Sequence, residues 1–274
     1  MNRKIIEGIQ KYLRRDTGHS KERTMHEVRS QKLLDELYNE GRVICTGKFL
    51  QKMTSEGMDI EITFMSGTAF ALNYIIVKGI CVYFERKCYL EIGSYIGDSI
   101  YNVKDVCDKC ISITAPIKAP WSMDDYCKRF GFPNFSNRLI AGYNIEQFLT
   151  NSQKFDFKRV KDKPDIVLID GEESYKGIKH DTENIKKIKS KDAIIIWQLT
   201  KRPPSGRVAC MDILAGIKDA LTEDEWKNCY VFDNSSFGIY IPKKYTQKIE
   251  DCLKWDRDTL YTYALNVKVN ERTK

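Results

Sequence analysis

The stretch "YLEIGSYIGDSI", residues 89–100, constrains the fold of this chain more than any other. Apolar residues around Glu91 predict a buried strand, and Gly93 and Gly97 follow it with three residues between them. A helix is predicted to begin at Asp98. A glycine turn between a strand and a helix favours a nucleotide or a related ligand, because helix N-terminal amides and a backbone without Cβ atoms allow close approach.

The chain beyond this turn alternates between predicted strands and helices. The segments "PDIVLID" (164–170) and "AIIIWQ" (193–198) are continuously apolar, which is typical of central parallel strands covered on both faces. Further strands are predicted at 110–114 and 138–142, and helices at 67–85, 98–106, 123–130 and 144–151. Segment 229–242, "CYVFDNSSFGIYIP", predicts an antiparallel hairpin. We therefore predict an α/β fold with a Rossmann-like, doubly wound sheet of seven strands, one of them antiparallel.

The ends of the chain have a different pattern. Residues 1–65 are predicted to form a helical extension, in which a helix begins with the capping pattern Thr24 to Glu27 and stops near Gly41. Residues 66–274 are predicted to form the main domain. It closes with an amphipathic helix that carries apolar residues at Ile249, Leu253, Leu260 and Val267.

Composition narrows the classes of protein. No apolar run of the 274 residues is long enough for a signal peptide or a membrane span, so we expect a soluble, cytoplasmic protein. Nine scattered cysteines are expected to be mostly core thiols, and the CxxC pair Cys107 and Cys110 lacks a second pair to complete a zinc site. The net charge of +7 is spread over the chain without an arginine stripe, which makes nucleic acid an unlikely partner.

The turn differs from the GxGxxG pattern of nicotinamide-binding proteins, since it reads ExGxxxG at Glu91, Gly93 and Gly97. With the terminal hairpin, it resembles the class I S-adenosylmethionine-dependent methyltransferases. "LEIGSYIGDS" and "IDGEESYKGIKHD" together are similar to the small-molecule and glycan O-methyltransferase group, which includes macrocin O-methyltransferase and cephalosporin hydroxylase-like relatives. The similarity covers about residues 65–242.

This resemblance implies a set of residues that contact S-adenosylmethionine. The turn would pass the methionine and ribose part, the "SGT" stretch before the first domain helix would lie over the cofactor, and the ends of the next strands would approach the ribose and adenine. The implied residues are Glu91, Gly93, Ser94, Gly97, Ser66, Thr68, Thr114, Tyr143 and Asp170.

Four positions depart from the pattern of the group. Thr114 stands where an acid binds the ribose hydroxyls, and Tyr143 stands within the segment that usually reads GDS. Glu173 replaces the histidine that is a natural general base. The fifth strand ends at Trp197 and Gln198 instead of an acid pair, which disfavours magnesium dependence and leaves no predicted metal site.

The resemblance implies methyl transfer to a hydroxyl of a small molecule or glycan. Asp170 and Glu173 are the candidates for the catalytic base or for orienting the substrate. The substrate-binding candidates are Glu172, Trp197, Gln198, Arg202 and Arg207, while Tyr175 and Asp181 are expected to serve helix packing and capping.

Two alternatives remain open at this point. The fold could have lost its chemistry and serve as a binding or scaffold protein, which the four departures tolerate. A nucleic-acid methyltransferase is disfavoured because "IDGEES" replaces the [DNS]PP[YFW] motif of that class. The group commonly self-associates, so residues 1–65 would form a lid or a homodimer contact.

Overall fold

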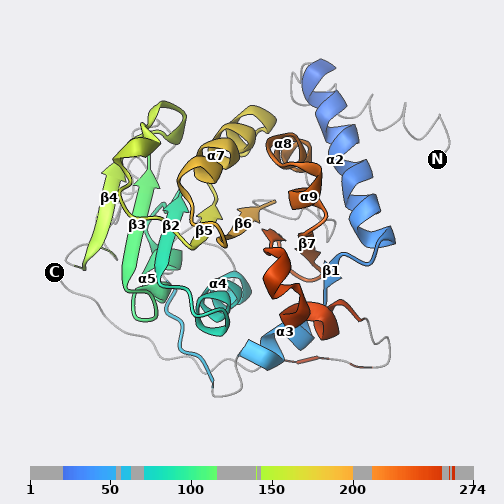
Figure 1. Ribbon diagram of the computed structural model, residues 1–274, viewed down its shortest axis with the longest axis horizontal. Coiled ribbons are helices and arrows are strands. Elements are labelled where there is room, and N and C mark those ends of the chain that lie inside the picture. The colour runs from blue at the N-terminus through green and yellow to red at the C-terminus, as the bar shows by residue number, and fades with distance from the viewer. Residues whose placement is uncertain are drawn as a thin grey trace, which may run out of the picture.

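A computed structural model of the chain describes residues 21–53, 57–62, 71–115, 140, 143–199, 212–254, 259 and 261–262. Their centre is one sheet of eight strands with helices on both faces (Figure 1). The order of strands across the sheet is β1-β7-β8-β6-β5-β2-β3-β4. The strands are β1 (Val43–Ile44), β2 (Cys88–Ile92), β3 (Lys109–Thr114), β4 (Ile145–Leu149), β5 (Ile166–Ile169), β6 (Ile194–Gln198), β7 (Cys229–Phe232) and β8 (Phe237–Tyr240).

The directions of the strands confirm the predicted fold class. β2, β3, β4, β5 and β6 run parallel to one another, and among the described strands only β8 runs antiparallel to its two neighbours, β6 and β7. β1 is an eighth strand, which pairs in parallel with β7 at the far edge. The chain builds β2, β3 and β4 toward one edge and then returns through β5 and β6 toward the other, so the order reverses between β2 and β5.

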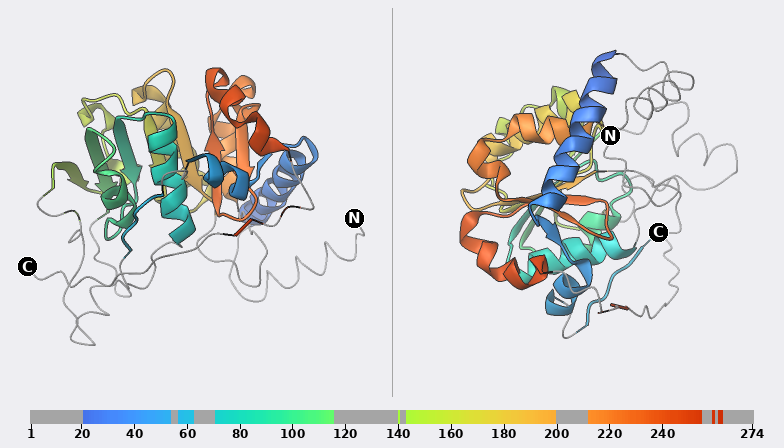
Figure 2. Two further views of the ribbon diagram at one scale, coloured as in Figure 1. Left: turned by 90° about the horizontal axis from the view of Figure 1, so that it is seen from below. Right: turned by 90° about the vertical axis from the view of Figure 1, so that its right-hand side faces the viewer.

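Helices cover both faces of this sheet (Figure 2). One face carries α3, α4, α5 and η4, and the other carries α2, α7, α8 and α9. The helices are α2 (Lys21–Asn39), α3 (Thr46–Met53), α4 (Ala71–Tyr83), α5 (Asp98–Val103), α7 (Tyr175–Ile188), α8 (Ile213–Ala220) and α9 (Glu223–Trp226), with 3-10 helices η1 (Ser152–Lys154), η2 (Phe157–Arg159) and η4 (Lys243–Leu253).

The central strands are buried on both faces, as their sequences predict. In β5, Ile166 and Leu168 pack in the core beneath α4 and α5, while Val167 and Ile169 pack in the core beneath α7 and α8. In β2, Glu91 shares the face of Tyr89, because side chains alternate along a strand. This alternation directs a carboxyl group toward the layer of α4 and α5.

The prediction of a helix at 144–151 is wrong. These residues form β4, whose Cα partners in β3 run from Cys110 opposite Ile145 to Thr114 opposite Leu149. Pairing with β3 outweighs the helix-favouring Glu and Gln of this segment. The strand predicted at 138–142 and the helix predicted at 123–130 lie outside the described residues, apart from Ile140.

The N-terminal segment is more than a helical extension. The predicted helix is present as α2, but it begins at Lys21, so Thr24 lies within it and does not cap it. Val43 and Ile44 add β1 to the sheet. The boundary at residue 65 and the roles of residues 1–65 as lid or dimer contact stay predictions.

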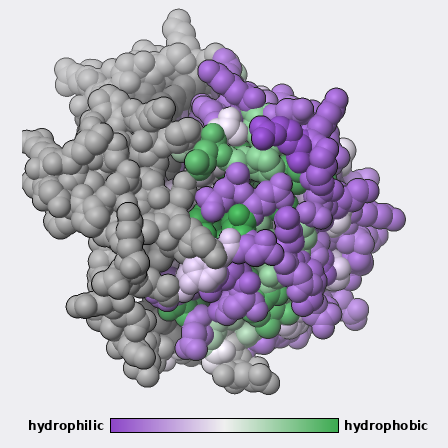
Figure 3. Space-filling view, turned by 90° about the vertical axis from the view of Figure 1, so that its left-hand side faces the viewer, coloured by the Kyte–Doolittle hydropathy of each residue, from purple (hydrophilic) through white to green (hydrophobic). Residues whose placement is uncertain are grey.

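The β4 side of the molecule has a mostly hydrophilic described surface with small hydrophobic groups (Figure 3). Tyr143 and Leu149 are among the exposed large hydrophobic residues.

In the described part of the chain, no helix combines the length and the hydrophobicity that a bilayer span needs.

Candidate active site

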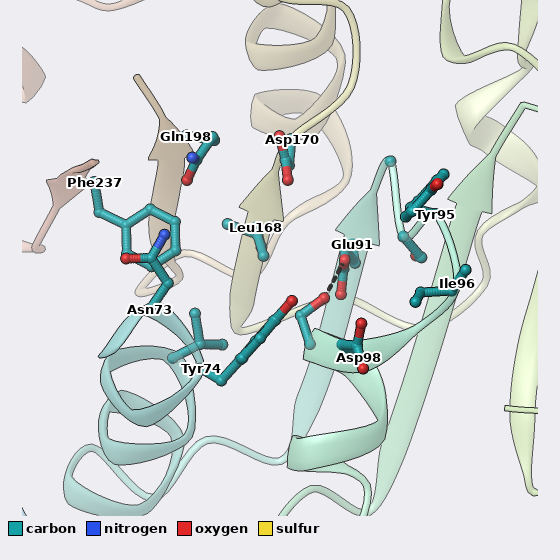
Figure 4. Close-up of a pocket in the computed structure, with 14 residues that line it drawn as sticks. Asn73, Tyr74, Glu91, Tyr95, Ile96, Asp98, Leu168, Asp170, Gln198 and Phe237 are labelled. Carbon is teal, nitrogen blue, oxygen red and sulfur yellow. Dashed lines mark hydrogen bonds between the residues drawn. The ribbon is translucent and has the colours of Figure 1, made fainter. Parts of the chain in front are cut away.

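A hollow lies at the carboxyl ends of β2, β5 and β6, beside the start of α4 (Figure 4). Its volume is about 440 Å³, including space open to solvent, which is within the usual range of small-molecule sites. The described residues that line it are Asn73, Tyr74, Val77, Glu91, Gly93, Ser94, Tyr95, Ile96, Asp98, Ser99, Leu168, Asp170, Gln198 and Phe237. The predicted glycine turn therefore forms one wall of this hollow.

Gly93 and Gly97 hold the turn in a conformation that other residues resist. Their φ angles are +92° and +97°, and Tyr95 between them also has a positive φ of 50°. A Cβ atom on Gly93 would lie 2.0 Å from the carbonyl oxygen of Asp170, and one on Gly97 would lie 2.6 Å from Cγ2 of Ile140. The interpretation that these glycines leave room for a ligand is therefore incomplete, because protein atoms occupy the space of both side chains.

Glu91 is the most unusual group of the hollow. Its side chain is 1% exposed, and it accepts hydrogen bonds from Tyr89 Oη at 2.8 Å and from Ser99 Oγ. Burial raises the pKa of Glu91 to about 7, although both hydrogen bonds favour the carboxylate. A cation placed beside Glu91 would recover part of the free energy that its desolvation costs.

The remaining polar groups of the wall are mainly acceptors and hydroxyls. Asp98 is 3% exposed and raises the pKa of Glu91 further, and Ser94 shares a 2.8 Å hydrogen bond with Ser112. Gln198 donates to Ser236 Oγ at 2.9 Å. Among the described lining residues there are three carboxyl groups and no Lys, Arg or His. The electrostatic potential of the hollow therefore favours a cationic ligand.

Of the predicted catalytic pair, only Asp170 lines the hollow. It follows β5 directly, and its backbone N–H donates to the carbonyl of Ile92 at 2.8 Å, which holds it against the glycine turn. Glu173 is half-buried, and Glu172 is exposed and accepts a 2.9 Å hydrogen bond from Ser174. Neither glutamate belongs to the described lining, so their roles stay predictions.

The structure contradicts the placement of two predicted site residues. Trp197 is 1% exposed, and its indole N–H donates to Thr182 of α7 at 3.0 Å, so it belongs to the core and not to a substrate site. Tyr143 lies just before β4, and its ring packs against Tyr101. It therefore lies at the amino end of β4, away from the carboxyl ends that form the hollow. Thr114 ends β3 and is buried, outside the described lining.

The packing roles predicted for Tyr175 and Asp181 are confirmed. Tyr175 stacks on His26 of α2 with ring centroids 3.7 Å apart and donates to Asp219 at 2.7 Å. Asp181 is fully buried and accepts from Ser152 at 3.0 Å.

Ser66, Thr68, Arg202 and Arg207 lie outside the described residues, so their predicted roles stay predictions. The lining also includes residues that the sequence patterns did not predict, among them Asn73 and Tyr74 at the start of α4 and Phe237 at the start of β8. The signal for Asn73 and Tyr74 was their position just after the "SGT" stretch that the resemblance placed over the ligand.

Among the described residues, no group of three or more His, Cys, Asp or Glu side chains is arranged to hold a metal ion.

The sequence matches no family model and no curated protein. The structure is similar to a methyltransferase from Podospora anserina solved with S-adenosylhomocysteine, at 13% identity and a TM-score of 0.45, covering 87% of this chain and 95% of that one. It is also similar to an O-methyltransferase of tomaymycin synthesis from Streptomyces achromogenes, solved with S-adenosylmethionine. The sequence identity is 11% and the TM-score 0.43, and the similarity covers 75% of this chain and 94% of that one. A third similar structure is an O-methyltransferase from Bacillus cereus solved with S-adenosylhomocysteine. The sequence identity is 11% and the TM-score 0.44, and the similarity covers 72% of this chain and 90% of that one. All three TM-scores lie below 0.5, so these similarities do not by themselves assign a function.

Proposed function

We propose that this chain is an S-adenosylmethionine-dependent methyltransferase that modifies a hydroxyl group of a small molecule or glycan. The observation that carries the proposal is the acidic hollow between the ends of β2 and β5. In open α/β sheets, ligands bind at the carboxyl ends of strands where the strand order reverses, and the order reverses at this point.

The charge of the hollow supports this cofactor over a dinucleotide. S-adenosylmethionine carries a sulfonium and an ammonium group, and both are cations. Glu91, Asp98 and Asp170 supply three carboxyl groups to the described wall, which would repel a pyrophosphate and stabilise a cation. The buried Glu91 is suited to the ammonium group, because a paired carboxylate tolerates burial better than an isolated one.

The site residues would act mainly by positioning. When bound, the cofactor supplies an electrophilic methyl group. Asp170, at the open end of β5, would accept the proton of the substrate hydroxyl or orient it, with Glu173 as the second candidate. Gln198, at the end of β6, would add a hydrogen-bonding amide beside the acceptor. Alignment of the hydroxyl with the methyl group then provides most of the rate enhancement.

Methyl transfer tests the chemical half of the proposal. We expect methyl-labelled S-adenosylmethionine to label an acceptor from a panel of glycans and small hydroxyl compounds, and Asp170→Asn to lower the rate about 100-fold or more. Glu173→Gln tests the second candidate for the base, and since Glu173 lies outside the described lining we expect a smaller loss of rate than in Asp170→Asn. A rate that is unchanged in Asp170→Asn would remove that residue from the mechanism.

One observation favours the binding or scaffold alternative. The uncharged Thr114 ends β3, where a carboxylate would make a stronger, charge-assisted hydrogen bond to a ribose. A scaffold protein would bind S-adenosylhomocysteine but label no acceptor in the same panel.

A further inference from the structure

Three cysteines lie close together near the amino ends of the strands, on the side of the sheet opposite to the proposed active site. Cys107 lies in the turn between α5 and β3, Cys110 is the second residue of β3, and Cys81 belongs to α4. The Cys107 thiol lies close enough to the thiols of Cys110 and Cys81 for both to shift its pKa, and it donates to the carbonyl of Arg86 at 3.5 Å. The CxxC pair of the sequence is therefore part of a larger thiol cluster.

This cluster is reachable from the surface. Cys107 and Cys110 both line a hollow of about 530 Å³, including space open to solvent, whose rim carries Lys104, Asp105 and Asp108. Cys107 is 7% exposed, whereas Cys81 is 1% exposed and does not belong to the lining. A small reagent that enters the hollow therefore meets Cys107 and Cys110 and not Cys81.

We propose that Cys107 and Cys110 form a thiol modification site, in which Cys107 reacts with a low-molecular-weight disulfide and Cys110 resolves the adduct to an intramolecular disulfide. Cys107 and Cys110 are three residues apart in the chain and both line the same hollow, so an S–S bond between them would close a short loop. The site is independent of the proposed methyl transfer, because it lies at the amino ends of the strands.

The electrostatics of the cluster assign the attacking role to Cys107. The neighbouring thiols of Cys110 and then Cys81 lower the pKa of Cys107, against the opposing effects of burial and Asp165 and with help from Lys87. The pKa of Cys110 is raised, mainly by its hydrogen bond to Cys107 and by burial. Since the thiolate is the nucleophile, Cys107 is the thiol that attacks first.

The reaction balances with the external disulfide as the oxidant. The Cys107 thiolate attacks one sulfur of that disulfide, forms a mixed disulfide and releases one thiolate. Cys110 then gives its proton to that thiolate and attacks Cys107 Sγ, which forms the Cys107–Cys110 bond and releases a second thiolate that is protonated by solvent. The two cysteines lose two electrons, and the external disulfide is reduced to two thiols.

Cys88 is the natural internal comparison. It is more exposed than Cys107, but burial and Asp165 raise its pKa to about 12. Exposure alone would make Cys88 the more reactive thiol, whereas thiolate stabilisation selects Cys107. The two explanations thus predict different labelled residues.

The test is to treat the full chain with glutathione disulfide, block the remaining thiols with N-ethylmaleimide and map the peptides without reduction. In this map we expect a Cys107–Cys110 linkage that dithiothreitol reverses. In a separate measurement on the reduced protein, we expect N-ethylmaleimide to alkylate Cys107 about tenfold or more faster than Cys88. Cys110→Ser should stop at the glutathione adduct on Cys107, and Cys88→Ser should behave as the wild type. Thermal denaturation checks that each variant folds. If a variant does not fold, the peptide map of the wild-type protein still tests the proposal. Labelling of Cys88 first, a Cys81–Cys107 linkage, or no reaction at Cys107 would overturn the proposal.

Discussion

Glu91→Gln is expected to weaken binding of S-adenosylmethionine by about 30-fold or more and to stabilise the unliganded protein at pH 8. Removing one partner of a buried, hydrogen-bonded charge pair typically costs about 2 kcal/mol or more of binding free energy. In the unliganded protein, the same change removes a carboxylate that is 1% exposed and has no cation among the described lining residues. Calorimetric titration and thermal denaturation measure the two effects.

The pH dependence follows from the pKa of Glu91, which is raised from 4.5 to about 7. Because the folded-state pKa lies above the unfolded value, the contribution of Glu91 to stability is full below about pH 4.5 and is lost as the pH rises through about 7. This loss is roughly 3 kcal/mol for the unliganded protein. A cationic ligand prefers the ionised form, so its affinity should rise about tenfold from pH 6 to pH 8.

Glu146→Gln is the matched control for Glu91→Gln. Glu146 lies on the edge strand β4, pairs with Lys109 at 3.0 Å and does not belong to the described lining of the hollow. It should leave both affinity and its pH dependence unchanged. Binding by Glu91→Gln with wild-type affinity, or with the wild-type rise between pH 6 and pH 8, would show that Glu91 does not face the cationic part of the ligand.

Gly93→Ala is expected to destabilise the fold by about 3 kcal/mol or more. The φ of +92° costs an L-residue about 1–2 kcal/mol, and the new Cβ atom would meet the Asp170 carbonyl at 2.0 Å, which adds an overpacking cost of similar size or larger. Relief would require movement of the Asp170 backbone, which is hydrogen-bonded to Ile92 at 2.8 Å. Chemical denaturation with urea measures the change.

Gly41→Ala separates the two costs. Gly41 has a φ of +69°, but apart from its chain neighbours no heavy atom of the described residues lies within 4 Å of the Cβ position. Only the conformational cost of about 1–2 kcal/mol should therefore remain. Equal destabilisation by the two substitutions would contradict the close approach of the turn and the Asp170 loop.

The fold could be predicted from the sequence wherever both faces of a strand are buried. The apolar runs of β5 and β6 predict only central strands, because residues such as Ile166 to Ile169 must be covered on both faces of the sheet. Edge strands lack this signal. In β4, only Ile145 is buried, and the apolar residues Ile145, Phe148 and Leu149 have the i, i+3, i+4 spacing of a helix. β1 is too short, at two residues, to give a pattern.

The site could be predicted in outline but not in its contacts. The glycine spacing located the turn, and the end of β5 located Asp170. The sequence did not reveal that the space above Gly93 belongs to the Asp170 backbone, since this contact joins residues far apart in the chain. Nor did it reveal that Trp197 faces α7, because a strand that is apolar throughout gives no indication of which side chain points to which face.

Calorimetric titration of the wild-type chain with S-adenosylmethionine and S-adenosylhomocysteine at pH 8 tests the central claim most directly. The acidic hollow at the end of β2 predicts binding with a dissociation constant below about 100 μM, which corresponds to roughly 5.5 kcal/mol. It also predicts weaker binding at pH 6, where Glu91 is protonated. Absence of heat with either ligand at millimolar concentration would contradict the proposed cofactor and, with it, the proposed methyl transfer.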